Sequence, residues 1–123
     1  MADEGKRNLR ARTTAYALRI IRLYGTLPKT TEAQVIGKQL LRSGTSVGAH
    51  YREADRAKSA ADFISKMEGG TQELDETDYW LELLVESKIM PEAKLADLRL
   101  ETQELIAIFV ASVKTAKKNS SRR

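Results

Sequence analysis

The stretch that decides the fold runs from Thr31 to Ala54 and reads TEAQVIGKQLLRSGTSVGAHYREA. Apolar or small residues recur along it at alternating steps of three and four: Ala33, Ile36, Leu40, Gly44, Val47, Tyr51 and Ala54. This spacing is the seam of a 3.5-residue repeat, and helices with such a seam pack nearly aligned in bundles. The stretch therefore predicts one long helix that buries a single face.

The same spacing continues on both sides of this stretch. Further seams are formed by Tyr16, Ile20, Leu23 and Leu27, by Phe63, Met67, Gly70, Leu74, Thr77, Leu81 and Leu84, and by Leu95, Leu98, Thr102, Leu105, Phe109, Ser112 and Ala116. No segment alternates with a period of two, so no strand is expected. We predict an all-α chain: an antiparallel, up-down-up-down four-helix bundle over residues 1–116, followed by a basic, flexible tail over residues 117–123.

Capping and turn residues separate the four predicted helices. Gly25 followed by Pro28 ends the first helix. Thr31 with the glutamine at position 34 matches a capping box and begins the second. Ser59 begins the third in a weaker version of that signal, and Pro91 stands at the first position of the fourth. The connections are short, as a bundle of neighbouring helices requires.

The composition of the 123 residues excludes several classes of protein. There is no cysteine, which excludes a disulfide framework and any thiolate metal site. No apolar run approaches the roughly 18 residues that a membrane span needs, and no apolar signal segment follows the N-terminus. We therefore expect a cytoplasmic protein with no membrane partner.

The net charge of +4 is modest, but it is unevenly distributed. Residues 59–90 carry two basic residues against eight acidic ones, whereas residues 1–30 carry seven basic against two acidic. Two interpretations are open, and both can hold together. The acidic helix pairs with basic neighbours within the chain, or the basic segments face a polyanion.

Two features favour close helix packing and assembly of copies. Gly44 and Gly48 lie four residues apart on one face of the predicted helix, where each costs about 1 kcal/mol relative to alanine. We interpret them as positions where another helix approaches closely. Tyr79 and Trp80 lie off the main seam of the third helix, and such extra apolar width favours burial against another copy. With Tyr51 in its seam, these residues are the candidates for packing and assembly; a wider core-facing stripe is the alternative.

No pattern predicts a catalytic, nucleotide or metal site. Residues 42–48 lack the lysine and the preceding strand of a phosphate-binding loop. His50 is the only histidine, and Val47 stands where a Glu-x-x-His metal motif needs glutamate. Ser43 has no evident base partner, and the acidic residues between 75 and 86 follow helical spacing, as on a solvated face. We expect no enzymatic activity, no metal and no cofactor.

Basic residues cluster in three places and are the more suggestive feature. The candidates for nucleic-acid contact are Arg42, Arg52, Arg56 and Lys58 on the second helix and beyond it, and Lys114, Lys117 and Lys118 near the C-terminus, which ends in Arg122 and Arg123. Lys6, Arg7, Arg10 and Arg12 form a similar cluster at the N-terminus. Repeated around an oligomer, such clusters would bind a phosphate backbone in a salt-dependent way without reading sequence.

The segment 38–54, KQLLRSGTSVGAHYREA, with Asp62-Phe-Ile and the segment 76–84, ETDYWLELL, resembles a known family. This is the bacterial four-helix-bundle family first noticed as reading frames in intervening sequences of 23S rRNA genes, and the likeness runs from about Tyr16 to Ile108. It implies a small homo-oligomer, typically a pentamer, with no catalytic residues. A more distant likeness, to the accessory protein of diversity-generating retroelements, implies nucleic acid and a nucleic-acid-processing protein as partners. His50 departs from the family, where asparagine is common.

These observations lead to one leading hypothesis and one rival. The leading hypothesis is a non-catalytic homopentameric bundle whose basic surface contacts RNA or DNA as an accessory factor. The rival is a protein-binding scaffold whose basic patches only keep it in solution. A comparison of binding to generic RNA at two salt concentrations separates them.

Overall fold

The computed structural model describes residues 2–121, with side chains from Asn8 onward. Its helices are α1 (Ala2–Thr26), α2 (Thr31–Asp55), α3 (Ala60–Glu86) and α4 (Glu92–Ser121). No strand occurs among these residues, so the predicted all-α class with four helices is confirmed.

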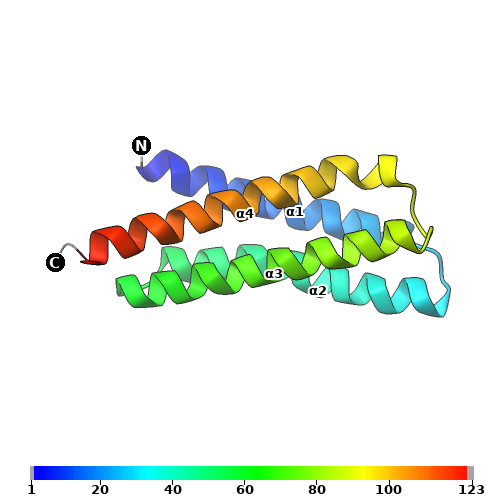
Figure 1. Cartoon of the computed structure of the whole chain (residues 1–123), viewed down its shortest axis with the longest axis horizontal. Helices are drawn as coiled ribbons and strands as arrows, with labels where there is room; N and C mark the ends of the chain where they lie inside the picture. Colours follow the sequence, from blue (N-terminus) through cyan, green and yellow to red (C-terminus); the bar gives the residue numbers. More distant parts are fainter. Residues whose placement is uncertain (1, 122–123) are drawn as a thin grey trace.

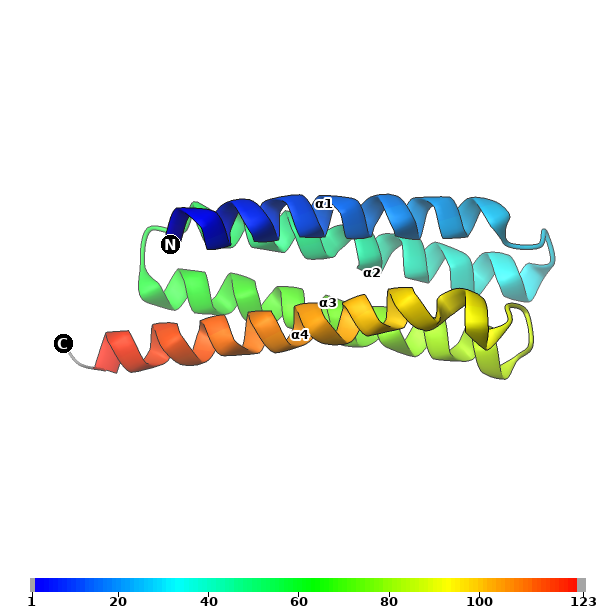
Figure 2. The same cartoon turned by 90° about the horizontal axis from the view of Figure 1, so that it is seen from above.

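The four helices lie side by side along the long axis of the molecule (Figure 1). Gly37 of α2 lies against Leu27, which directly follows α1, while Gly48 lies against Thr13, in the first half of α1. These two helices therefore run in opposite directions, and the short connections reverse the chain again after α2 and after α3. Figure 2 shows α1 with α2 on one side of the molecule and α3 with α4 on the other.

This arrangement gives the molecule two different ends. The start of α1, the end of α2, the start of α3 and the end of α4 share one end, which we call the terminal end because both chain termini lie there (Figure 1). The α1–α2 and α3–α4 connections form the opposite end. Segments far apart in the sequence are thereby brought together, which decides where the charged residues gather.

The predicted seams form the core. The fully buried side chains include Tyr16, Ile20, Leu40, Leu74 and Phe109, all of them seam positions. Some positions differ from the prediction: the seam residues Leu23, Ile36, Phe63 and Ala116 are only partly buried. The α1 seam begins earlier, with buried Leu9 and Thr13, and Val113 rather than Ser112 is buried near the end of α4.

Buried hydroxyl groups pair across the core instead of being left without partners. The Tyr16 hydroxyl lies 2.7 Å from Thr102 Oγ1 and joins α1 to α4. Ser43 Oγ lies 2.8 Å from Thr77 Oγ1 and joins α2 to α3. A buried hydroxyl without a partner is costly, so each pair favours one alignment of its two helices.

Two predicted boundaries need correction. Thr30, not Thr31, is the N-cap of α2, with Thr30 Oγ1 accepting from the Ala33 amide at 3.4 Å. This shift puts Gln34 beyond the capping box, and its side chain instead donates to the Pro28 carbonyl at 2.8 Å and accepts from Tyr24. Ser59 caps α3 as predicted.

The second correction concerns the tail predicted over residues 117–123. α4 continues through Ser121, so residue 117 is not a helix boundary. No proline or glycine interrupts this segment, and the lysines near its end interact favourably with the helix dipole. Residues 122 and 123 lie outside the described part of the chain.

Candidate nucleic-acid interface

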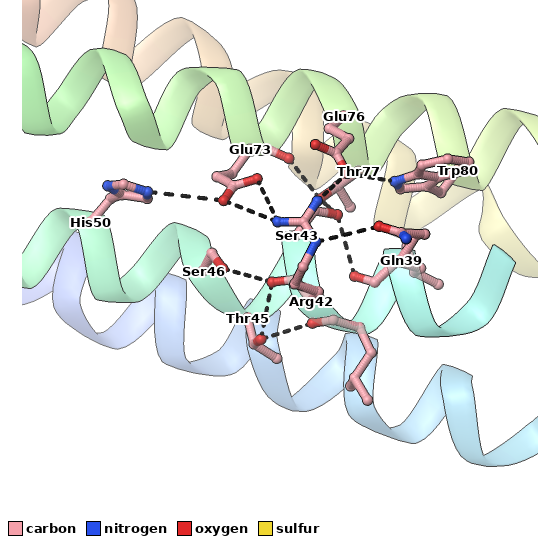
Figure 3. Close-up of polar contacts among 12 residues, drawn as sticks. Gln39, Arg42, Ser43, Thr45, Ser46, His50, Glu73, Glu76, Thr77 and Trp80 are labelled. Carbon is pink, nitrogen blue, oxygen red and sulfur yellow. Dashed lines mark hydrogen bonds and ion pairs between the residues drawn. The ribbon is translucent and has the colours of Figure 1, made fainter. Parts of the chain in front are cut away.

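Arg42 is held by two carboxylates of the same chain. Its guanidinium points from α2 toward α3, where it lies 3.4 Å from the Glu73 carboxylate and pairs with Glu76 (Figure 3). The Arg42 Nε group also donates to Gln39 Oε1 at 3.3 Å. Its charge is therefore partly matched within the helix pair, although the side chain is 48% exposed, and its contact with nucleic acid stays a prediction.

Glu76 is fixed by a second donor as well. Trp80 Nε1 donates to Glu76 Oε2 at 3.0 Å, and this bond, with the Arg42 guanidinium, lowers the pKa of Glu76. The indole ring also lies 5.0 Å from the ring of Tyr79, measured between centroids. Trp80 is thus half-buried on the α2 side of α3, whereas Tyr79 is 52% exposed.

The hydroxyl groups of residues 43–46 have structural roles. Ser43 is fully buried and bonded to Thr77, and Thr77 donates in turn to the Glu73 carbonyl at 2.7 Å. Thr45 and Ser46 donate to carbonyls of their own helix at 2.7 Å each, as Figure 3 shows. None of these bonds pairs a hydroxyl with a base that could activate it.

His50 lies on α2 beside α3. Its ring packs against Gly69, where an added Cβ would lie only 2.9 Å from His50 Cε1. His50 Nε2 is 3.9 Å from Glu73 and Nδ1 is 3.6 Å from Glu53, distances too long for hydrogen bonds. Within residues 8–121 no group of three or more metal-binding side chains is placed to hold an ion.

Arginines from α1 and α2 gather at the terminal end. Arg10, Arg52 and Arg56 line a shallow hollow between the two helices together with Glu53. Arg52 donates to Thr14 Oγ1 at 3.2 Å, which holds its side chain across the helix pair. The sequence separates Arg10 from the other two, and the reversal between α1 and α2 brings them together.

Lysines from the α2–α3 connection and from α4 gather at the same end. Lys58 lines a second hollow with residues 116, 119 and 120 of α4. Lys114 and Lys117 line a third between α3 and α4, where Lys117 lies 3.4 Å from Glu68. Lys118 is exposed on the following turn. Among the described carboxylates, none forms an ion pair with Lys58, Lys114 or Lys118.

The basic residues of the N-terminal cluster do not lie together in the structure. Arg12 pairs with Glu101 at 2.6 Å and with Glu104 at 3.2 Å, both on α4, and its charge is matched there. Arg10 instead lies with Arg52 and Arg56 at the terminal end. The local sequence did not predict this difference between Arg10 and Arg12. The side chains of Lys6 and Arg7, like Arg122 and Arg123, lie outside the described residues.

The predicted packing residues act mainly inside the chain. A Cβ at Gly44 would lie 2.8 Å from Ile20, and one at Gly48 would lie 3.3 Å from Thr13, so both glycines admit α1. Tyr51 is buried, with its ring 6.4 Å from that of Phe109. Among these candidates, Tyr79 is the large side chain that remains mostly exposed.

Comparison with known proteins identifies relatives of this chain. The model of the 23S rRNA-intervening sequence protein family matches residues 7–111. A similar crystal structure is that of a protein of unknown function from the S23 ribosomal protein family of Bacteroides thetaiotaomicron. The two sequences are 34% identical, and the structures superpose with a TM-score of 0.84. The alignment covers 89% of this chain and 98% of that one. No curated protein matches. The resemblance seen in segment 38–54 is confirmed. None of the helices in residues 2–121 is long and apolar enough to cross a membrane.

Proposed function

The chain belongs to the family of 23S rRNA-intervening sequence proteins. From the positions of its basic side chains we propose that it is a non-catalytic, oligomeric bundle that binds RNA or DNA through its terminal end. The binding is non-specific, and the protein acts as an accessory factor in the cytoplasm, possessing no cofactor. A nucleic-acid-processing protein is the partner that such a factor would serve. A homopentamer is the assembly that we favour, on the strength of the family likeness.

One observation carries the nucleic-acid part of the proposal. Basic side chains from three separate segments meet at the terminal end, and Arg56, Lys58 and Lys118 there have no ion-pair partner among the described carboxylates. On the sides of the bundle Arg12, Arg42 and Arg99 each lie against a carboxylate on a neighbouring helix. The other cations without an ion pair among the described residues, such as Arg22 and Lys38, are spread singly over the surface. Cations without matched carboxylates are those that can exchange counterions for phosphates.

The acidic helix supports the same division. Glu73, Glu76 and Asp78 on α3 pair with basic residues of α2 and α4 along the sides of the bundle. Both interpretations of the charge pattern therefore have a place: intramolecular pairing on the sides, and surplus positive charge at one end. Exposed ion pairs of this kind contribute little to stability, so their main consequence is to decide which cations remain accessible.

The test compares two triple variants with the same change of net charge. Arg56→Gln, Lys58→Gln and Lys118→Gln remove cations at the terminal end, and the control set Lys29→Gln, Lys88→Gln and Lys94→Gln removes exposed ones at the opposite end. We expect the first variant to bind generic RNA more weakly. Its log affinity should fall less steeply with log salt, by about 0.7–0.9 for each phosphate that the variant no longer neutralises.

The control set should bind within about twofold of the parent, because long-range charge effects are screened beyond roughly 10 Å at 0.1 M salt. Equal weakening by both sets would mean that only net charge matters. A parent chain that fails to bind RNA or DNA at physiological salt would refute the nucleic-acid function and leave the protein-binding scaffold in its place.

A further inference from the structure

We propose that copies of this chain join head to tail, with the outer face of α1 and α2 on one copy seated on the outer face of α3 and α4 on the next. This inference rests on the assembly part of the proposed function and adds which surfaces meet. The two faces lie on opposite sides of the molecule, as Figure 2 shows.

Each face exposes large apolar side chains near the middle of the bundle. Leu18 and Ile21 of α1 are 45% and 47% exposed, and Tyr79 of α3 and Leu100 of α4 are 52% and 59% exposed. Single exposed apolar residues are common on monomers. Here, however, two such pairs stand on helices at opposite sides of the molecule, and all four side chains remain exposed in the single chain.

The two apolar pairs also stand at the same height along the bundle. The Tyr16–Thr102 hydrogen bond aligns α1 with α4 along the bundle axis. Leu18 and Leu100 each lie two residues from a bonded residue, so they stand at about the same height. The Asp78–Arg99 pair, at 3.2 Å, sets the level of Tyr79 beside Leu100 as well. Neighbouring copies can therefore align side by side without sliding along the axis, as rotation about an axis parallel to the bundle requires.

The charges of the two faces are complementary. No acidic residue occurs between Glu4 and Glu32, so α1 presents only basic charges around its apolar pair. Arg22 on α1 and Lys38 on α2 are exposed, and no described carboxylate pairs with them. On the opposite face α3 exposes Asp75 and Glu86, on either side of Tyr79 in the sequence, and the lysines of that face, Lys114 and Lys117, lie nearer the terminal end.

This complementarity decides the mode of association. Two α1–α2 faces meeting about a two-fold axis would bring like charges together, and two α3–α4 faces would do the same. A basic face on an acidic face avoids both. Such a heterologous contact leaves one face of each kind unused at every step, so it continues until the rotation closes a ring.

The available area is sufficient for a stable contact. A 25-residue helix is roughly 37 Å long, and two adjacent helices are about 20 Å wide, which gives a face on the order of 700 Å². Stable interfaces bury about 800 Å² per partner. Because exposed charge pairs contribute little affinity, the apolar side chains supply the attraction and the charges select the orientation.

The test exchanges charges between the faces and follows assembly by sedimentation velocity. Arg22→Glu with Lys38→Glu reverses the basic face, and Asp75→Lys with Glu86→Lys reverses the acidic face. We expect each double variant to need on the order of tenfold more protein for half-assembly than the parent. A control, Lys29→Glu with Lys88→Glu, makes the same charge change in the α1–α2 and α3–α4 connections and should assemble as the parent does.

Two rescues separate this contact from other effects. A chain with all four changes restores opposite charges at every contact and should assemble like the parent. An equimolar mixture of the two double variants should form mixed assemblies at a lower protein concentration than either variant alone, measured by native mass spectrometry; a ring of five would hold three copies of one variant and two of the other. Misfolded variants would be rescued by neither.

If the parent assembles and the chain with all four changes stays dissociated, the head-to-tail contact is wrong. Assembly of the parent by some other contact would still hold. Double variants that assemble as the parent does would overturn it too. A parent that sediments as a monomer at micromolar concentration would refute both the contact and the assembly in the proposed function.

Discussion

Replacing Gly70 with alanine tests the close packing of α3 against α4 most directly. A Cβ built at this position lies 2.5 Å from Phe109 Cε2 and 3.0 Å from Cδ2. The Phe109 ring is fully buried, and its neighbour Tyr51 is buried as well. Carbon atoms in contact normally lie about 3.5–4.0 Å apart, so the ring or the helix must retreat by about 1 Å.

Two opposing effects set the size of the change. Alanine gains about 1 kcal/mol over glycine in a helix interior. Overpacking of a well-packed core costs about 1–3 kcal/mol, and a rigid aromatic ring that is enclosed on all sides places this site in the upper part of that range. We therefore expect Gly70→Ala to lower the free energy of unfolding by about 1–2 kcal/mol.

The assay is chemical and thermal unfolding at one fixed protein concentration, because an oligomer's stability depends on concentration. For a chain of this length, 1 kcal/mol corresponds to roughly 3–6 °C in Tm. Gly25→Ala is the matched control, since nothing within the chain lies within 4 Å of a Cβ there. We expect the control to be neutral or to gain up to about 1 kcal/mol.

A Gly70→Ala variant that melts at or above the parent would refute the packing argument. It would mean that the glycine only weakens the helix and that the α3–α4 contact has room for a methyl group. Equal effects at Gly70 and Gly25 would carry the same conclusion, because the two sites differ in surroundings and not in the substitution.

Three further changes test other contacts. Tyr16→Phe removes the bond to Thr102 and should cost about 1 kcal/mol in urea unfolding at pH 8. Burial raises the pKa of Tyr16 above its ordinary 10.0, so the parent should lose stability as pH rises above about 10 and the variant should lose less; equal losses would refute this. The pKa of Glu76 is lowered below 4.5, chiefly by the Trp80 bond, so the stability that the Glu76 carboxylate contributes is present above pH 4.5 and lost as pH falls below it. Glu76→Gln should therefore make the free energy of unfolding vary less between pH 3 and 5. An unchanged pH profile would contradict this. Lys88 adopts a φ of 64°, and Lys88→Gly should raise the free energy of unfolding by about 0.5–1 kcal/mol, whereas a lower Tm would show that its side chain matters more.

Much of the fold is predictable because helical periodicity is local. The steps of three and four identified the buried positions Leu40, Val47 and Leu74 without reference to any other segment. The capping signal placed the start of α2 one residue too late, at Thr31 instead of Thr30. The two adjacent threonines carry the same hydroxyl group, and only the backbone conformation selects one of them as the N-cap.

The candidate interface was predictable only in part. Arg42 on α2 and Arg56 at the C-cap of α2 carry the same charge, and their charge alone does not distinguish them. Across the helix pair, however, Arg42 faces Glu73 and Glu76, while Arg56 lies at the end of α2, where no described carboxylate pairs with it. Ion pairing depends on which residues of another helix are near, and that depends on how the helices are aligned.

The helical class, the number of helices, their seams and the family likeness can all be predicted from the chain's residues alone, since each follows from short-range spacing or from a contiguous motif. By contrast, the packing of Ile20 of α1 against Gly44 and the approach of Arg10 to Arg52 and Arg56 at the terminal end depend on how the helices are arranged in space. The same holds for the exposed apolar side chains on helices at opposite sides of the molecule. These properties are contacts between segments distant in sequence, and they exist only once the reversals of the chain and the alignment of the helices are fixed.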